Sequence, residues 1–194
     1  MSLADTIRAR FEASMDVPAP LAGDGMVWEE GAPVPAAVLV AITDRPEPGL
    51  ILTRRNEALR KHPGQVAFAG GRADPEDTGP IDTALREANE EIGIPRDVVT
   101  VIGCDTPYRT VTNFSIIPVI GIVPPDLSLL PREFEVADIF EVPLAHVLDP
   151  VNQQRLEGEF RGRQRSYYEI IWNDRRIWGA TAAMIVNLTR RLAA

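Results

Sequence analysis

The segment that most constrains the fold runs from Arg86 to Ile94, because its charged and apolar residues recur with the period of an α-helix. Three carboxylates, Glu87, Glu90 and Glu91, are spaced i, i+3 and i+4 and therefore share one helix face. The opposite, apolar stripe contains Ile81, Leu85, Ala88 and Ile92. Two interpretations of the acidic face are open: a divalent cation that offsets the repulsion between the glutamates, or a solvated charged face.

The flanking residues indicate where this helix begins and ends. Pro80 suits a first helical turn, where its missing N–H is not needed, and Gly93 followed by Pro95 ends the helix. We therefore expect a helix over residues 80–93. A β-like run over Gln65–Ala69 and the paired glycines 70–71 precede it, with a polar loop between. The order is thus strand, glycine loop and acidic helix.

This arrangement resembles the Nudix box, in which a glycine is followed by a loop carboxylate and then by an Arg-Glu…Glu-Glu helix. The matching positions are Gly71, Asp77, Arg86, Glu87, Ala88, Glu90, Glu91, Gly93 and Ile94. Asp77 stands where the usual box has Glu, and eight residues rather than seven separate it from Arg86. The half that carries the metal chemistry is intact.

A second stretch resembles the coenzyme A diphosphatase branch of the Nudix hydrolases. It comprises Leu52–Asn56 and Leu59–Phe68, although Ala69 stands where that branch usually has Pro. The branch also tolerates the longer box spacer. The similarity extends over residues 34–192 and implies cleavage of coenzyme A, or of its derivatives, into 3′,5′-ADP (3′-phospho-AMP) and 4′-phosphopantetheine.

The resemblance implies a metal role for each residue of the acidic helix. Mg²⁺ or Mn²⁺ would be held by Glu87 and Glu91 first and by Glu90 second, with the Gly71 carbonyl as a further contact. Arg86 would hold the glutamates in place. Nudix enzymes draw the general base from different positions, so the candidates stay open: Glu87, Glu90, Glu133, Glu135 and Asp138.

Basic residues crowd just before the glycine loop, where a phosphate would lie if the box holds metals. The expected substrate-binding residues are Arg54, Arg55, Arg60, Lys61, His62 and Gln65. Guanidinium groups bind phosphate bidentately, although a solvated charged turn is the alternative. His146 is expected to be structural, and Trp178 is expected to pack the C-terminal helix onto the sheet.

The remaining pattern predicts an α+β Nudix fold, an α/β/α sandwich around a mixed sheet. A short N-terminal helix is expected around Leu3, Ile7 and Phe11, and a second main helix, besides that over 80–93, is expected over 179–192. Strands are expected at 36–42, 49–53, 65–69, 98–106, 116–123, 139–142 and 165–172. We expect one Nudix hydrolase domain over 1–194, with an N-terminal helix and loop extension over 1–33 and a core over 34–194.

The charge and the distribution of apolar residues argue against nucleic acid and membranes as partners. A formal charge of −8 argues against binding duplex nucleic acid, which requires a basic face. No run of 18 apolar residues exists, and the single cysteine, Cys104, forms no internal disulfide. We expect a cytoplasmic enzyme with a small-molecule substrate and no membrane partner; the oligomeric state is open.

Three hypotheses for the function follow. The first is the coenzyme A diphosphatase described above. The second keeps the chemistry but changes the substrate to ADP-ribose, NADH or a nucleoside triphosphate. The third is a Nudix-fold binding module without turnover, which the intact acidic helix argues against because such a module needs no set of chelating residues in register.

Overall fold

The computed structural model describes residues 1–24, 31–59, 62–160 and 162–193. Its centre is a mixed sheet with β1 (Val34–Thr43) in the middle. β1 runs parallel to β7 (Phe114–Val123) along its whole length and antiparallel to β2 (Gly49–Arg55) and β4 (Ala69–Arg72). The sheet is completed by β3 (Val66–Ala67), β5 (Thr100–Cys104), β6 (Tyr108–Arg109) and β8 (Val136–Pro143). The mixed sheet expected from the sequence is confirmed.

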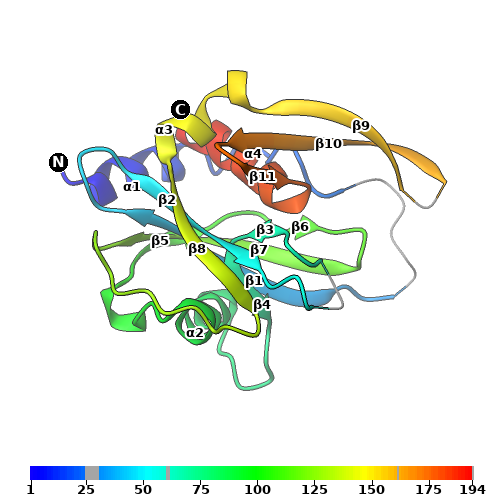
Figure 1. Ribbon diagram of the computed structural model, residues 1–194. Helices are drawn as coiled ribbons and strands as arrows, with labels where there is room; N and C mark the ends of the chain where they lie inside the picture. Colours follow the sequence, from blue (N-terminus) through cyan, green and yellow to red (C-terminus); the bar gives the residue numbers. More distant parts are fainter. Residues whose placement is uncertain (25–30, 60–61, 161, 194) are drawn as a thin grey trace.

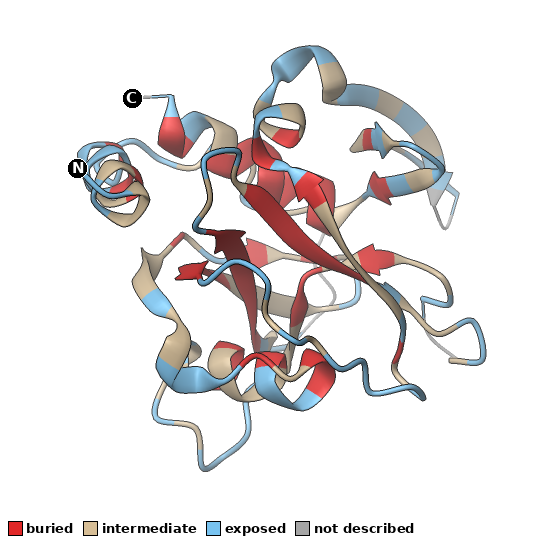
Figure 2. Ribbon diagram, turned by 60° about the vertical axis from the view of Figure 1, so that its left-hand side comes forward, coloured by how far each residue is buried: buried red, intermediate tan, exposed pale blue. Residues whose placement is uncertain are grey.

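Helices cover both faces of this sheet (Figure 1). The helix α2 (Pro80–Ile92) packs on one face, against Ala37, Leu39 and Ala69. The other face is covered by α1 (Leu3–Ala13), α3 (Leu144–Leu148) and α4 (Ala180–Leu192). Two short 3₁₀ turns, Arg96–Val98 and Pro150–Asn152, connect elements. Figure 2 shows the buried residues concentrated in the central strands between the helical layers. This is the expected α/β/α sandwich of an α+β protein.

A second, three-stranded antiparallel sheet was not expected from the sequence. It consists of β9 (Gln154–Phe160), β10 (Arg163–Trp172) and β11 (Arg175–Trp178), in the order β11-β10-β9. Its inner residues Ile170 and Ile177 are fully buried in the core that contains α4. The expected strand over 165–172 is therefore present, but it belongs to this smaller sheet.

The strand expected over residues 65–69 is wrong in one respect. The chain forms two short strands there, and each has a different partner: β3 pairs with β2, whereas β4 pairs with β1. Phe68 lies between the two strands and is buried. This change of partner brings the paired glycines beside the acidic helix.

The orientation of α2 also differs from the expected amphipathic pattern. Its ends are as expected, with Pro80 in the first turn and Gly93 as a left-handed cap at a φ of 72°. Ile81, assigned to the apolar stripe, is 40% exposed, whereas Glu91, assigned to the wet face, is only 6% exposed. In this orientation Glu91 accepts a hydrogen bond from the backbone of β4, as described below.

Candidate metal centre

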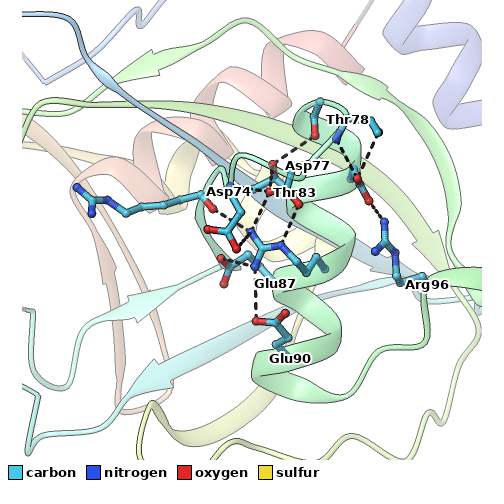
Figure 3. Close-up of polar contacts among 11 residues, drawn as sticks. Asp74, Asp77, Thr78, Thr83, Glu87, Glu90 and Arg96 are labelled. Carbon is cyan, nitrogen blue, oxygen red and sulfur yellow. Dashed lines mark hydrogen bonds and ion pairs between the residues drawn. The ribbon is translucent and has the colours of Figure 1, made fainter.

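Arg86 and Asp77 form the anchor of the loop that precedes α2 (Figure 3). The Arg86 guanidinium donates from Nε and Nη2 to the two Asp77 carboxylate oxygens, both at 2.9 Å, and from Nη2 to the Arg72 carbonyl at 3.0 Å. The Asp77 side chain is 5% exposed, and these hydrogen bonds hold its pKa well below the usual range. Asp77, which replaces the usual glutamate, therefore ties the loop to the helix.

Glu91 is a buried carboxylate that faces the glycine pair. The Gly70 N–H donates to Glu91 Oε2 at 3.0 Å. Burial raises the pKa of Glu91 to about 7, and the nearby charge of Glu87 adds to this effect. The Gly70 hydrogen bond and the charge of Arg55 act in the opposite direction. A buried carboxylate with one backbone donor is a group that a cation would stabilise.

Glu87 lies against the second glycine of the pair. A Cβ built on Gly71 would come within 2.6 Å of the Glu87 carboxylate carbon, so a larger residue at this position would displace the carboxylate. Arg86 Nη1 donates to Glu87 Oε1 at 3.0 Å, and burial raises the pKa of Glu87. The Gly71 backbone and the Glu87 carboxylate are thus in direct proximity.

Glu90 is the most exposed of the three glutamates. Its side chain is 45% exposed, and Arg86 Nη1 lies 3.5 Å from its carboxylate. Within the described ranges, no three acidic, histidine or cysteine side chains converge into a preformed metal cage. The residues nevertheless fit Mg²⁺ or Mn²⁺, because Mg²⁺ is usually held by one or two carboxylates together with water and substrate phosphates. Glu87 and Glu91 could supply those two carboxylates.

Comparison with known proteins assigns this arrangement to a family. The NUDIX domain model matches residues 33–162, which is more than half of the chain. This chain belongs to the Nudix family. It is 46% identical over 157 residues to an uncharacterized Nudix hydrolase NudL of Cronobacter sakazakii, covering 81% of this chain and 82% of that protein. The NudL relative of Yersinia enterocolitica is 44% identical over 157 residues, covering 81% and 80%.

Solved structures support the same fold. The Nudix hydrolase RenU from M. smegmatis superposes with a TM-score of 0.52 at 23% identity, covering 66% of this chain and 84% of that one. A MutT/nudix family protein from Enterococcus faecalis gives a TM-score of 0.51 at 14% identity, covering 97% and 68%. With its Nudix hydrolase relatives, the chain is a hydrolase of pyrophosphate bonds, which sets aside the binding module without turnover. Nudix hydrolases generally use divalent metal ions.

One loop of this Nudix hydrolase joins the acidic helix to the end of β2. The Arg132 N–H donates to the Glu91 carbonyl at 2.8 Å. Asn56 donates from its side-chain Nδ2 to the Glu133 carbonyl at 2.7 Å and from its backbone N–H to the Glu135 carbonyl at 2.9 Å. The charge of Glu135 also contributes to the raised pKa of Glu91, so this acid lies near the centre. Asp138, another candidate base, instead accepts from Arg175 at 2.5 Å.

The expected basic cluster of the Nudix hydrolase is divided between two places. Arg55 acts on the pKa of Glu91, whereas Arg54, His62 and Gln65 line a separate cavity. Neighbouring residues of a strand point to opposite faces, which explains why Arg54 and Arg55 separate. Arg60 and Lys61 lie outside the described residues.

Two aromatic-ring predictions have different outcomes. His146 is structural, as expected: its ring lies 4.7 Å from that of Trp172, and Nε2 is 2.8 Å from the Ile171 carbonyl. The prediction for Trp178 is wrong, because this side chain is 36% exposed and lines the cavity. The neighbouring residue Ile177 is the one that packs in the core. Alternation along a strand could have given this signal, but the sequence did not show where β11 begins.

Proposed function

We propose that this Nudix hydrolase cleaves the diphosphate of coenzyme A or of a coenzyme A derivative into 3′,5′-ADP and 4′-phosphopantetheine. The observation that carries the proposal is the position of the segment resembling the coenzyme A branch. Its residues Arg54, His62 and Gln65 line a cavity, and the same segment continues through β3 into the glycines beside Glu87 and Glu91.

The proposed metal ligands are Glu87 and Glu91, with the Gly71 backbone beside them and Glu90 as an outer carboxylate. When bound, Mg²⁺ or Mn²⁺ would lower the pKa of a water molecule and neutralise charge on the diphosphate. Arg86 fixes the positions of these carboxylates, because it donates hydrogen bonds to Asp77, to Glu87 and to the Arg72 carbonyl. It is a positioning residue.

Arg55 is the proposed diphosphate contact. Its Nε is buried and, among the described residues, has no hydrogen-bond partner, although its charge acts on Glu91. A buried guanidinium N–H without a partner is costly, and a phosphate oxygen would satisfy it. Arg55 can therefore bind an anionic group next to the carboxylates.

Glu135 is the proposed general base. In the reaction, a bond forms between the water oxygen and one phosphorus, and the bond from that phosphorus to the bridging oxygen breaks. The leaving phosphate keeps the electron pair of the broken bond, and Glu135 accepts the proton of the water. The loop holds Glu135 between Asn56 and the end of α2, within electrostatic range of Glu91.

A substrate panel tests the proposal. Coenzyme A, dephospho-coenzyme A, ADP-ribose, NADH and a nucleoside triphosphate are incubated with the protein and Mg²⁺, and products are separated by chromatography. We expect the highest kcat/KM for coenzyme A, a lower value for dephospho-coenzyme A and a lower one still for ADP-ribose. A higher kcat/KM for ADP-ribose or a triphosphate would refute the coenzyme A assignment and leave the diphosphatase chemistry in place. The cytoplasmic location stays a prediction; within the described residues, no helix combines the length and apolar character that a bilayer span requires.

A further inference from the structure

A cavity of about 450 Å³ lies at the edge of the main sheet, where the second sheet meets it. Its walls include Arg54, the segment 62–66 and the turn of β10 and β11, from Asp174 to Trp178. The volume falls in the range of about 300–1,000 Å³ that is usual for ligand sites. The proposed reaction does not by itself explain why β11 contributes to this cavity.

Trp178 is the large aromatic residue of the cavity wall. The Arg176 guanidinium lies 5.0 Å from the centre of its ring, and Tyr167 meets it edge-on at 6.0 Å. Arg176 is in turn held by Glu169. The indole is therefore fixed by its neighbours although 36% of the residue is exposed. A fixed, partly exposed indole is suited to stacking on a planar ring, because little side-chain entropy remains to be lost.

Some charged side chains of the cavity already form ion pairs within the protein, whereas others do not. Arg175 is bound to Asp138 at 2.5 Å and stacks on Phe140 at 3.9 Å. The Arg54 side chain has no hydrogen bond or ion pair within the part of the chain that the structure describes, and the residue is exposed. Asp174 adds a carboxylate that can accept from an amino group. The aromatic ring suits a planar base, the carboxylate suits an amino group on that base, and the available cation suits a phosphate. Together these groups match a nucleotide whose base carries an amino group.

The cavity is also within reach of the carboxylates. Val66 lines the cavity, and Gly70, which bonds Glu91, follows four residues later. Four residues span at most about 14 Å. We propose that the cavity binds the nucleotide end of the substrate, with the purine base stacked on Trp178 and the phosphate that is not cleaved next to Arg54. This inference rests on the proposed function and assigns the two ends of the substrate to different places.

Binding of the two product halves tests the assignment directly. Isothermal titration calorimetry in EDTA measures the Kd of 3′,5′-ADP and of 4′-phosphopantetheine for the wild type and for Trp178→Ala. We expect Trp178→Ala to weaken 3′,5′-ADP at least about 10-fold, as base stacking predicts, while 4′-phosphopantetheine is unaffected. Trp178→Phe should keep the nucleotide affinity within about threefold. Ile171→Ala, a control on the same small sheet where Ile171 is 45% exposed, should bind like the wild type.

Arg54→Gln provides a second variant at an exposed position, so that the test does not depend on the folding of Trp178→Ala. It should weaken 3′,5′-ADP about 10-fold and AMP much less. Unchanged 3′,5′-ADP affinity in both variants, or a loss of 4′-phosphopantetheine instead, would overturn the inference. Coenzyme A turnover is measured in parallel. Trp178-dependent nucleotide binding without coenzyme A cleavage would refute only the proposed function. Coenzyme A cleavage with a KM that Trp178→Ala does not change would refute only the inference.

Discussion

Replacing Glu91 with glutamine should stabilise the metal-free protein at alkaline pH. Glu91 is 6% exposed, and burial raises its pKa to about 7 from an ordinary value of 4.5. Between these two pH values, the folded protein keeps a proton that the unfolded chain has released. The free energy of unfolding of the metal-free wild type therefore falls as the pH rises through this window and is lowest above pH 7.

The size of the effect follows from the same two values. The interval from 4.5 to about 7, at 1.36 kcal/mol per pH unit, gives about 3 kcal/mol. Glutamine keeps the acceptor for the Gly70 N–H but carries no charge, so Glu91→Gln should abolish this pH dependence. We expect the variant to match the wild type near pH 4 and to exceed it by about 3 kcal/mol at pH 8.

Urea unfolding in EDTA at several pH values between 4 and 8 measures this difference. Saturating Mg²⁺ should stabilise the wild type at pH 8 and have little effect on Glu91→Gln, because a ligand that binds the native state raises its stability. Glu90→Gln is the matched control: its side chain is 45% exposed and should leave the pH profile unchanged. If the unfolding free energies of the wild type and Glu91→Gln stayed parallel from pH 4 to 8, the burial argument would be refuted.

The other predictions concern activity and two ion pairs. Hydrolysis should stop in EDTA and return with Mg²⁺ or Mn²⁺. The variant Glu87→Gln should fold normally, as circular dichroism will show, but its turnover should be about a thousandfold slower, equivalent to about 4 kcal/mol in the barrier. Wild-type turnover in this variant would place the metal elsewhere. Asp77→Ala should lower the free energy of unfolding in urea by about 3 kcal/mol, because it removes the bidentate partner of Arg86. The double variant with Arg86→Ala should lose much less than the sum of the two single losses. Losses that add fully would show that the two side chains are not coupled. The side chains of Arg191 and Asp105 are each 3% exposed, and Arg191 Nε lies 2.9 Å from Asp105 Oδ1. Arg191→Met should therefore cost about 3–5 kcal/mol of unfolding free energy, measured by chemical unfolding, with part regained when Asp105→Leu is added; an unchanged stability would contradict the pairing.

The local sequence was sufficient for much of the fold and for the identity of the acidic centre. Pro80 and Gly93 define the ends of α2 through backbone preferences that need no tertiary contact. The spacing of Glu87, Glu90 and Glu91 was sufficient to place the three carboxylates on one helix. Short-range signals of this kind depend only on helix geometry and on residue chemistry.

Features that depend on strand pairing were not predicted. The run over residues 65–69 changes partner from β2 to β1, and no local pattern records which strand lies opposite. Asp77 looked like an imperfect match, yet its role depends on a loop that folds back onto Arg86. The small sheet and the exposure of Trp178 likewise follow from contacts between distant segments.

The sequence by itself therefore determined the acidic helix, its limits and the mixed α+β architecture. Only the tertiary structure decided that Glu91 is buried against Gly70 while Glu90 is exposed, and that Arg54 lies at the cavity whereas Arg55 lies near Glu91. The reason is physical: helix periodicity assigns residues to a face, but the rotation of that face, and the environment of each charge, depend on which distant strands pair and how closely they pack.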